Sequence, residues 1–580
     1  MSYKLKKKKG NIAGLPKKSK KSAQHNVSIS QALQTAVQHH QAGDLHQAEK
    51  FYNRVLALDP GNAEAHHYLG VLAYQVGKQE TAVNFIQKAL HLNPHLANAH
   101  NTLGVVLRDL GRLDEASASY RNALSSNPDF TEAYSNLGNV LKDQGRLDEA
   151  VANYRKALSV NPDDPEAHSS LLFALNYLPD ISQQEIREES VRWGERYAKK
   201  LVGEGVGHES RQEEGHCKKI RIGYVSPDFY HHPVGRFILP VLASHNRHEF
   251  EVYCYSGTPR PDAVTGNIKK HADHWLVTNG LNDGAMIRRI KDDRIDILVD
   301  LAGHSGGNRL MVFAGRPASI QVSWLGYVNT TGLPVMDYRI TDDIVDPVGE
   351  SEGHYTEILI RLKNGFFCFS PPENSPEVGD SPVRQTGLFT FGSFNNLCKI
   401  NDSVVSLWVE ILKRVPRSRL MLKSKAFADE NVKRYFGARF FNQGLDENRL
   451  ILLPGSSFAQ YLQSYQDIDV CLDPFPHNGH TVSCDALWMG CPVISLRGER
   501  YAARMGADLL TRIGLSELIA ENREQYVNKA VELAENSDRL DLLRSGMRTR
   551  VKEAPFCDAQ GFTSDLEGAF RKMMFALGMA

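Results

Sequence analysis

The sequence predicts an α-helical repeat solenoid followed by two α/β lobes, each with a parallel sheet. Two observations support this prediction. In the first part of the chain, prolines recur at a spacing of 34 residues, which is the period of a helix–turn–helix repeat. After residue 217, short apolar runs typical of buried strands alternate with helical patterns. This alternation indicates parallel sheets covered by helices.

Each recurring position of the 34-residue repeat has a structural reason. The prolines follow the second helix of each unit, which they cannot continue, and the glycines stand where the first helix must stop. Small residues allow the two helices to approach closely. One unit cannot bury its own apolar face, so neighbouring units stack to form the core. The recurring positions are Pro60, Pro94, Pro128 and Pro162; Gly43, Gly77, Gly111 and Gly145; and Ala48, Ala82, Ala116 and Ala150.

The repeats are predicted to be of the tetratricopeptide type and to occupy residues 27–164. The lysine-rich segment 1–26 has no apolar core and is interpreted as a disordered basic arm, not a secretory signal. Residues 165–216 are predicted as capping helices, beginning with one at 165–178, and a Gly/Glu-rich linker at 202–216. Arrays of this type present a concave surface to extended polypeptide, so protein or peptide partners are expected.

The two α/β series are predicted as an N-terminal lobe at 217–370 and a C-terminal lobe at 387–580, separated by a Pro/Ser/Glu-rich segment at 371–386. Ligands of open parallel sheets collect beyond the carboxyl ends of the strands, and two such lobes imply a cleft. The predicted strands are 219–229, 250–256, 295–303, 318–327 and 337–343 in the first lobe, and 388–396, 418–425, 448–455, 468–475 and 491–496 in the second.

Composition excludes several classes of function. The 68 basic and 68 acidic residues cancel, so no nucleic-acid partner is expected from the overall charge. No apolar run approaches the 18 or so residues that a membrane helix requires, so no membrane association is expected. The eight cysteines are scattered and form no close CxxC pairs, which predicts reduced, packed thiols and a cytoplasmic location.

The segment 471–495 predicts a phosphate site in the second lobe. An apolar strand leads into the turn PHNGH, and a helix opened by Thr481 or Ser483 follows. A helix N-terminus leaves backbone N–H groups free for an anion, and Gly479 lets the backbone come close to a phosphate. Asp485 could accept hydrogen bonds from sugar hydroxyls, and Lys399 could neutralise phosphate charge.

These groups fit a nucleoside diphosphate. A dinucleotide is not expected, because no GxGxxG follows the first strand, and GxxxxGK[ST] is also missing.

Several long motifs carry a resemblance to a known family. They are GYVSPDFYHHPVG, RPASIQVSWLGYVNTTGLPVMDYRITD, FGSFNNLCKI, LWVEILKRVPRSRL and HNGHTVSCDALWMGCPV. With the repeats, they cover nearly the whole chain, which resembles the O-GlcNAc transferase and Spindly family, glycosyltransferase family 41. The resemblance implies a GT-B fold of two Rossmann-like lobes. It also implies inverting transfer of N-acetylglucosamine from UDP-GlcNAc to protein Ser or Thr hydroxyls, with no metal or other cofactor.

The resemblance also implies roles on the donor side, in the C-terminal lobe. Lys399 matches the lysine that stabilises the leaving diphosphate, and Asp485 matches the acid that holds the ribose. His480 and Thr481 match the loop on the diphosphate and nucleoside, and Asn396 matches a polar position beside the phosphates. His477 is a weaker candidate for the donor loop than His480.

On the acceptor side, the matching residues lie in the N-terminal lobe. Asp228 and His232 match positions beside the donor sugar and the acceptor, where a general base is proposed for the family. Leu325 and Gly326 match a turn near the acceptor. The alternative for His232 is that it only shapes the turn before Pro233.

The chain departs from the family pattern at several positions. Val482 replaces a threonine that is common in the donor loop. Human-type enzymes carry basic or aromatic side chains near the nucleotide base, where this chain offers Phe458 and Tyr461. Long arrays of the family grip peptides with a column of asparagines, of which only Asn136 is an asparagine here, with Thr102 and Tyr68 at the other positions. The sequence Asp467-Ile468-Asp469 spells a metal-type DxD, which we interpret as structural because it leads into an apolar strand.

Two alternatives remain open from the sequence. One is a protein O-fucosyltransferase that uses GDP-fucose. The segments GYVNTTGLPVMDYRITD and FGSFNNLCKI are closer to the plant Spindly branch of the family, and that branch favours fucose. The other is a non-catalytic repeat scaffold, which would be expected to lose Lys399 or Asp485, although both are present. Acceptor proteins and oligomeric state are not predicted.

Overall fold

A computed structural model describes residues 20–198 and 219–578, with side chains from Ile29 onward. The chain divides into two compact units, and each is described here by itself. The first contains the repeat helices up to Gln144 together with Ala152–Pro162, and the second contains Gly145–Val151 and Asp163–Ala580. The basic residues 1–19 and the predicted linker at 202–216 lie outside the described residues.

The repeat unit consists of paired helices, which confirms the predicted tetratricopeptide architecture. Helix α1 begins at Lys20, so the disordered arm predicted for residues 1–26 does not extend over residues 20–26. The four glycines of the period end the first helix of each pair with φ of 78° to 81°, a conformation that favours glycine. The helices are α1 (Lys20–Gln41), α2 (Leu45–Leu58), α3 (Ala63–Gln75), α4 (Gln79–Leu92), α5 (Ala97–Asp109), α6 (Leu113–Ser126), α7 (Thr131–Asp143) and α8 (Leu147–Val160).

A second set of glycines allows the helices of each pair to touch. A Cβ atom on Gly104 would lie 2.6 Å from the Tyr120 ring, and one on Gly138 would lie 2.6 Å from the Tyr154 ring. Both tyrosines are fully buried. The tyrosine of the second helix therefore fills the space that a side chain on the first helix would need.

The helices after the repeats, α9 (Pro165–Leu175) and α10 (Gln183–Tyr197), belong to the second unit. The Ser169 hydroxyl lies 3.0 Å from Nδ1 of His304, and the Trp193 ring packs edge-on against the same histidine at 5.0 Å. These helices, predicted as capping helices, therefore pack on the first α/β lobe.

The first lobe has a seven-stranded parallel sheet in the order β3-β2-β1-β4-β5-β6-β7. The sequence missed β3 and β7, which are four-residue edge strands whose residues are exposed or half-buried. The strands are β1 (Ile220–Ser226), β2 (Phe250–Ser256), β3 (His274–Val277), β4 (Ile297–Asp300), β5 (Ile320–Ser323), β6 (Tyr338–Thr341) and β7 (Ile358–Arg361). Its helices are α12 (Pro233–Ser244), α13 (Ala263–Lys270), α14 (Asp283–Asp292) and α15 (Leu310–Ala314).

The second lobe has a six-stranded parallel sheet in the order β10-β9-β8-β11-β12-β13. Its strands are β8 (Phe389–Ser393), β9 (Ser418–Lys423), β10 (Leu450–Leu453), β11 (Val470–Leu472), β12 (Val493–Leu496) and β13 (Ile519–Ala520). Its helices are α16 (Pro382–Thr386), α17 (Asp402–Arg414), α18 (Glu430–Phe441), α19 (Phe458–Gln463), α20 (Thr481–Trp488), α21 (Met505–Arg512), α22 (Arg523–Glu535) and α23 (Ser537–Lys552). Two Rossmann-like lobes were predicted, and the structure confirms them.

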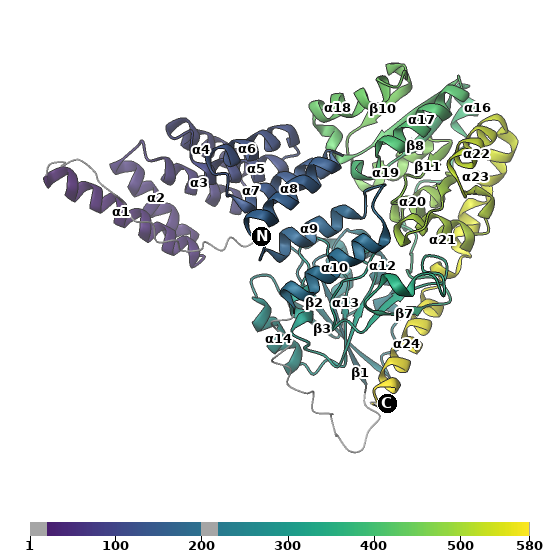
Figure 1. Cartoon of the computed structure of the whole chain (residues 1–580), viewed down its shortest axis with the longest axis horizontal. Helices are drawn as coiled ribbons and strands as arrows, with labels where there is room; N and C mark the ends of the chain where they lie inside the picture. Colours follow the sequence, from purple (N-terminus) through teal and green to yellow (C-terminus); the bar gives the residue numbers. More distant parts are fainter. Residues whose placement is uncertain (1–19, 199–218, 579–580) are drawn as a thin grey trace. The chain divides into compact units, whose positions relative to one another are not determined.

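The last helix, α24 (Ala559–Ala576), returns to the first lobe (Figure 1). Phe562, Leu566 and Phe570 are buried in the same apolar core as the strands β1, β2, β4 and β5. Glu567 accepts hydrogen bonds from the backbone N–H of Asn246, at 2.8 Å, and pairs with the His245 ring at 3.0 Å. The predicted boundary of 387–580 for the second lobe is therefore wrong in its last stretch.

Two expectations from composition can be compared with the described residues. None of the described helices is long and apolar enough to cross a bilayer. The seven described cysteines are free thiols, and six of them are buried, as predicted from their spacing.

We predict that Gly104→Ala lowers the stability of the repeat unit. The new methyl group would overlap the buried Tyr120 ring, and overpacking of this kind typically costs about 1–3 kcal/mol. Guanidinium unfolding followed by helical circular dichroism should show a lower midpoint than the wild-type protein. Gly546→Ala in α23 is the matched control, because no atom lies within 4 Å of the added methyl group. An unchanged midpoint for Gly104→Ala would contradict the proposed packing role.

Candidate functional site

The loop between β11 and α20 forms the centre of the candidate site. The structure confirms that α20 begins at Thr481, directly after the PHNGH turn, and its N-cap residue His480 gives no side-chain cap to the helix. The first backbone hydrogen bond into the helix runs from Cys484 N to the His480 carbonyl, at 2.9 Å. The amides of the first turn are therefore available to an anion, in the way a helix N-terminus favours.

The Asp473 carboxylate holds this loop through hydrogen bonds. Its Oδ1 accepts a hydrogen bond from the Gly479 backbone N–H at 2.6 Å, and its Oδ2 accepts one from the Ser495 hydroxyl at 2.7 Å. Burial raises the pKa of Asp473 to about 7, although these hydrogen bonds and the charge of Lys399 oppose the rise. A Cβ atom on Gly479 would lie 2.5 Å from the Ser483 hydroxyl oxygen. Gly479 is thus required by close packing, and its own N–H is occupied by Asp473.

Lys399 lies at the end of a short 3₁₀ turn, Leu397–Lys399, that follows β8. Its ammonium donates a hydrogen bond to the Asn478 carbonyl in the loop between β11 and α20, at 2.7 Å. Burial lowers the pKa of Lys399, and the nearby Asp473 carboxylate opposes this. Asn396 opens the same turn and is exposed. The structure therefore brings the predicted lysine and the predicted loop together.

His480 is held by aromatic side chains of the first lobe. Its ring centre lies 4.2 Å from that of Phe367, 4.7 Å from that of Phe237 and 5.0 Å from that of Phe366. Burial first, and the charge of Lys399 second, lower the pKa of His480 to about 3. Its Nε2 is buried without a hydrogen-bond partner among the described residues. His480 is therefore a neutral ring whose open nitrogen can serve a ligand.

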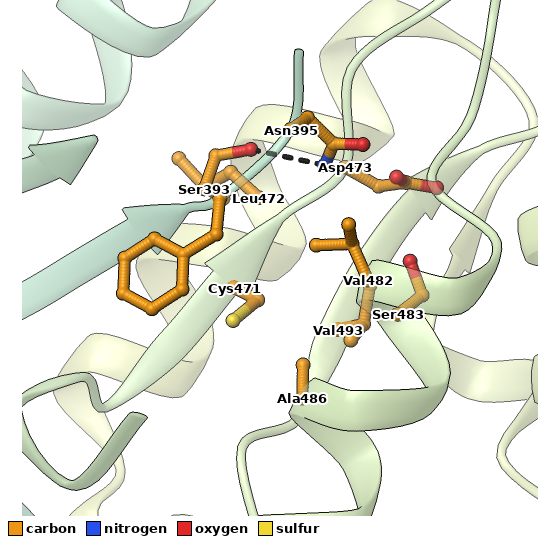
Figure 2. A pocket seen from close by; sticks show the side chains of 10 residues that line it. Ser393, Asn395, Cys471, Leu472, Asp473, Val482, Ser483, Ala486 and Val493 are labelled. Atoms are coloured by element: carbon orange, nitrogen blue, oxygen red, sulfur yellow. Dashed lines mark hydrogen bonds between the residues drawn. The ribbon is translucent and has the colours of Figure 1, made fainter. Parts of the chain in front are cut away.

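A small cavity lies where β8 and β11 end and α20 begins (Figure 2). Its volume of about 10 Å³ is room for one water molecule. Asp473, Ser483 and Asn395 line it, and Asn395 donates a hydrogen bond to the Ser393 hydroxyl at 3.3 Å. At most one water molecule therefore fits between the two strand ends and the start of the helix.

Asp485 is 2% exposed and pairs with an arginine of the other lobe. Arg236 in α12 donates two hydrogen bonds to its carboxylate, at 2.7 and 3.0 Å, and the Tyr461 hydroxyl donates a third at 3.3 Å. The guanidinium also lies over the Phe458 ring, at 5.1 Å from its centre. The ion pair holds the carboxylate in a single orientation and links the two lobes at the site.

Asp228 and His232 lie beyond the carboxyl end of β1. Burial raises the pKa of Asp228 to about 7, whereas burial, with a smaller effect of the His231 charge, lowers the pKa of His232 to about 4. His232 Nδ1 lies 3.6 Å from Asp228 Oδ2 and accepts a hydrogen bond from the Val234 N–H at 3.4 Å. The neutral His232 ring therefore carries its proton on Nε2.

Leu325 and Gly326 form the tight turn after β5. Leu325 has φ of 70°, and a Cβ atom on Gly326 would lie 1.9 Å from the Leu301 carbonyl oxygen. The turn therefore lies at the same sheet edge as Asp228, because β1, β4 and β5 are parallel.

Arg236 is the site residue that sequence reasoning missed. The family motif draws attention to the histidines before it, and only the structure shows that it meets Asp485, 249 residues later in the chain. The DxD residue Asp469 has a structural role. Its carboxylate accepts hydrogen bonds from the Ser381 hydroxyl and from the Val383 and Thr390 amides, at 2.7 to 3.0 Å.

Comparison with known proteins assigns the family. Residues 201–371 and 386–566 match the model described as "Glycosyl transferase family 41". The chain belongs to glycosyltransferase family 41. In the repeat region, residues 106–145 and 138–174 match "TPR repeat", and residues 41–123 match "Anaphase-promoting complex, cyclosome, subunit 3".

Relatives of this family-41 chain carry transferase names. A protein of Oryza sativa subsp. japonica named "Probable UDP-N-acetylglucosamine--peptide N-acetylglucosaminyltransferase SPINDLY" is 38% identical over 69% of this chain and 44% of its own length. An Arabidopsis thaliana relative named SEC, with the same activity in its name, is 34% identical over 62% of this chain and 38% of its own length. The chain thus spans less than half the length of these curated relatives.

A solved structure matches almost end to end. It is a mutant of Thermobaculum terrenum O-GlcNAc transferase, with 34% identity and a TM-score of 0.76 over 95% of this chain and 98% of that chain. The fold predicted from the sequence, a repeat array followed by a two-lobed catalytic region, is confirmed by this match.

Proposed function

We propose that this family-41 protein transfers N-acetylglucosamine from UDP-GlcNAc to Ser or Thr hydroxyls of proteins or peptides. The observation that carries the proposal is the position of Lys399, a half-buried lysine whose ammonium lies 2.7 Å from the Asn478 carbonyl in the loop that leads into α20. A cation and a helix N-terminus at one place form a site for a diphosphate. The names of the relatives and of the solved structure support the sugar and the acceptor.

The leaving group would be stabilised from the second lobe. As the bond between the sugar and the diphosphate breaks, negative charge develops on the diphosphate oxygens. The Lys399 ammonium and the amides of the first turn of α20 would meet that charge without reorganisation in a site of low dielectric. Asp485, oriented by Arg236, would accept hydrogen bonds from the ribose hydroxyls on its remaining lone pairs. Thr481 and Asn396 are proposed to contact the nucleotide and its phosphates.

The acceptor would be activated from the first lobe. The acceptor hydroxyl attacks the anomeric carbon as the diphosphate departs from the opposite face, which inverts the configuration. We infer that Asp228 receives the hydroxyl proton, because its carboxylate, with a pKa of about 7, is a stronger base than the His232 ring, with a pKa of about 4. His232, with its proton on Nε2, would donate a hydrogen bond to a substrate oxygen. The Leu325–Gly326 turn is proposed to border the acceptor.

We propose that this transfer uses no metal ion. The positive charge that the diphosphate requires is supplied by Lys399 and the start of α20, and Asp469 is already engaged by three donors of its own lobe. Protein or peptide acceptors are also proposed to contact the repeats. The cytoplasmic location expected from the sequence stays a prediction.

Donor selectivity provides the first functional prediction. Purified protein should release nucleotide from UDP-GlcNAc in the presence of an acceptor peptide, whereas GDP-fucose should be inactive. Lys399→Ala should lower kcat by roughly 10²–10³-fold, the range for removing one preorganised donor to a developing oxyanion. The activity should be the same with and without EDTA.

Lys433→Ala is a matched control, because this lysine is in α18 and pairs with Glu430 of the same helix. It should leave kcat unchanged. Release from GDP-fucose alone would assign the fucosyltransferase alternative, full activity in Lys399→Ala would remove the proposed leaving-group role, and inhibition by EDTA would contradict metal-independent transfer.

The pH dependence of the rate tests the proposed base. The raised pKa means that Asp228 is protonated below about 7 and ionised above it, so kcat should rise with pH through about 7 and then level off. His232 should contribute no titration between pH 6 and 9, because its pKa of about 4 keeps it neutral over that range. Asp228→Asn should lower kcat by about 10²–10⁴-fold and remove the ascending limb. An ascending limb that persists in Asp228→Asn would assign the proton to another group.

A further inference from the structure

The turn between α9 and α10 contacts site loops of both lobes. On the side of the first lobe, the Asn176 amide donates a hydrogen bond to the Tyr327 hydroxyl at 3.0 Å. The Asn176 side-chain oxygen accepts one from the Asn329 amide at 3.1 Å. Tyr327 directly follows the Leu325–Gly326 turn, so this end of α9 is anchored beside the acceptor-side loop.

On the side of the second lobe, the same turn packs against the donor loop. The ring of Tyr177 stacks on the ring of His477 with centres 4.5 Å apart and planes within 9°. The Leu178 carbonyl accepts a hydrogen bond from the Arg500 guanidinium at 2.9 Å. Tyr177 and His477 are 6% and 8% exposed, so the stack is excluded from water.

His477 connects this stack to Lys399 through one carbonyl group. His477 Nδ1 lies 3.2 Å from the Asn478 carbonyl oxygen, which also accepts the hydrogen bond from Lys399 at 2.7 Å. A carbonyl only accepts, so the neutral His477 ring carries its proton on Nδ1. The N–H of the same peptide, which is on Gly479, donates to Asp473 Oδ1 at 2.6 Å, which fixes the other side of the peptide.

We propose that Tyr177 is a positioning residue for Lys399. By stacking on His477, it holds the ring in the plane from which Nδ1 reaches the Asn478 carbonyl. That carbonyl in turn fixes where the ammonium of Lys399 lies. Helix α9 thus supplies a side chain to the donor site although it precedes both lobes in the chain. The inference rests on the proposed diphosphate role of Lys399.

A double-mutant cycle on nucleotide affinity tests this inference. UDP would be titrated calorimetrically into the full-length wild-type protein, Tyr177→Leu, Lys399→Ala and the double variant. If Tyr177 acts through Lys399, Tyr177→Leu should weaken UDP binding about tenfold in the wild-type background and less than twofold in the Lys399→Ala background. Tyr177→Phe keeps the stacked ring and should bind within about twofold of wild type.

Tyr197→Leu is the matched control for lost aromatic packing, because Tyr197 is buried at the end of α10 against Trp193 and His168. It should lower the thermal midpoint without changing UDP affinity. Equal losses of affinity from Tyr177→Leu in the two backgrounds would overturn the inference, and so would an equal loss in Tyr197→Leu.

Titrations with UDP and with GDP distinguish a failure of this inference from a failure of the proposed donor. A wild-type protein that binds GDP and not UDP would refute the donor, and the same four proteins titrated with GDP would still test the role of Tyr177. A wild-type protein that binds neither nucleotide would refute both.

Discussion

The hydrogen bond from the half-buried Lys399 ammonium to the Asn478 carbonyl is the interaction on which the proposed site depends. Removing a cation from water is costly unless it is paired or hydrogen-bonded. Here the Asn478 carbonyl and the charge of Asp473 offset part of that cost, and burial still lowers the lysine pKa. An anion placed between Lys399 and the start of α20 would complete the compensation. In the proposed mechanism, the partial burial of this cation would strengthen its attraction to a diphosphate and to the charge that develops on it.

The rest of the catalytic unit keeps this cation in place. Asp473 holds the Gly479 amide, the aromatic residues of the first lobe enclose His480, and Arg236 crosses from the first lobe to Asp485. The two lobes are thus linked by direct contacts at the proposed site. The returning helix α24 adds its apolar face to the core of the first lobe, so the chain passes from the second lobe back to the first.

Local patterns in the sequence predict the fold and much of the site. The 34-residue period predicts the repeats, and polar loops after parallel strands predict that Lys399 and the His480 loop meet, because the carboxyl ends of such strands share one edge. Pairing over long distances is not encoded in a local pattern. Three contacts depend on how the lobes and α9 pack: the pair of Arg236 with Asp485, the stack of Tyr177 on His477, and the return of α24 to the first lobe. The edge strands β3 and β7 escaped prediction because their residues are partly exposed.

A crystal structure of the protein with bound UDP would test the central claim most directly. The account predicts a diphosphate oxygen within about 2.7–3.2 Å of the Lys399 ammonium, with a second oxygen on the amides that open α20 and the ribose hydroxyls on Asp485. A nucleotide bound at another place, with Lys399 still held only by the Asn478 carbonyl, would contradict it.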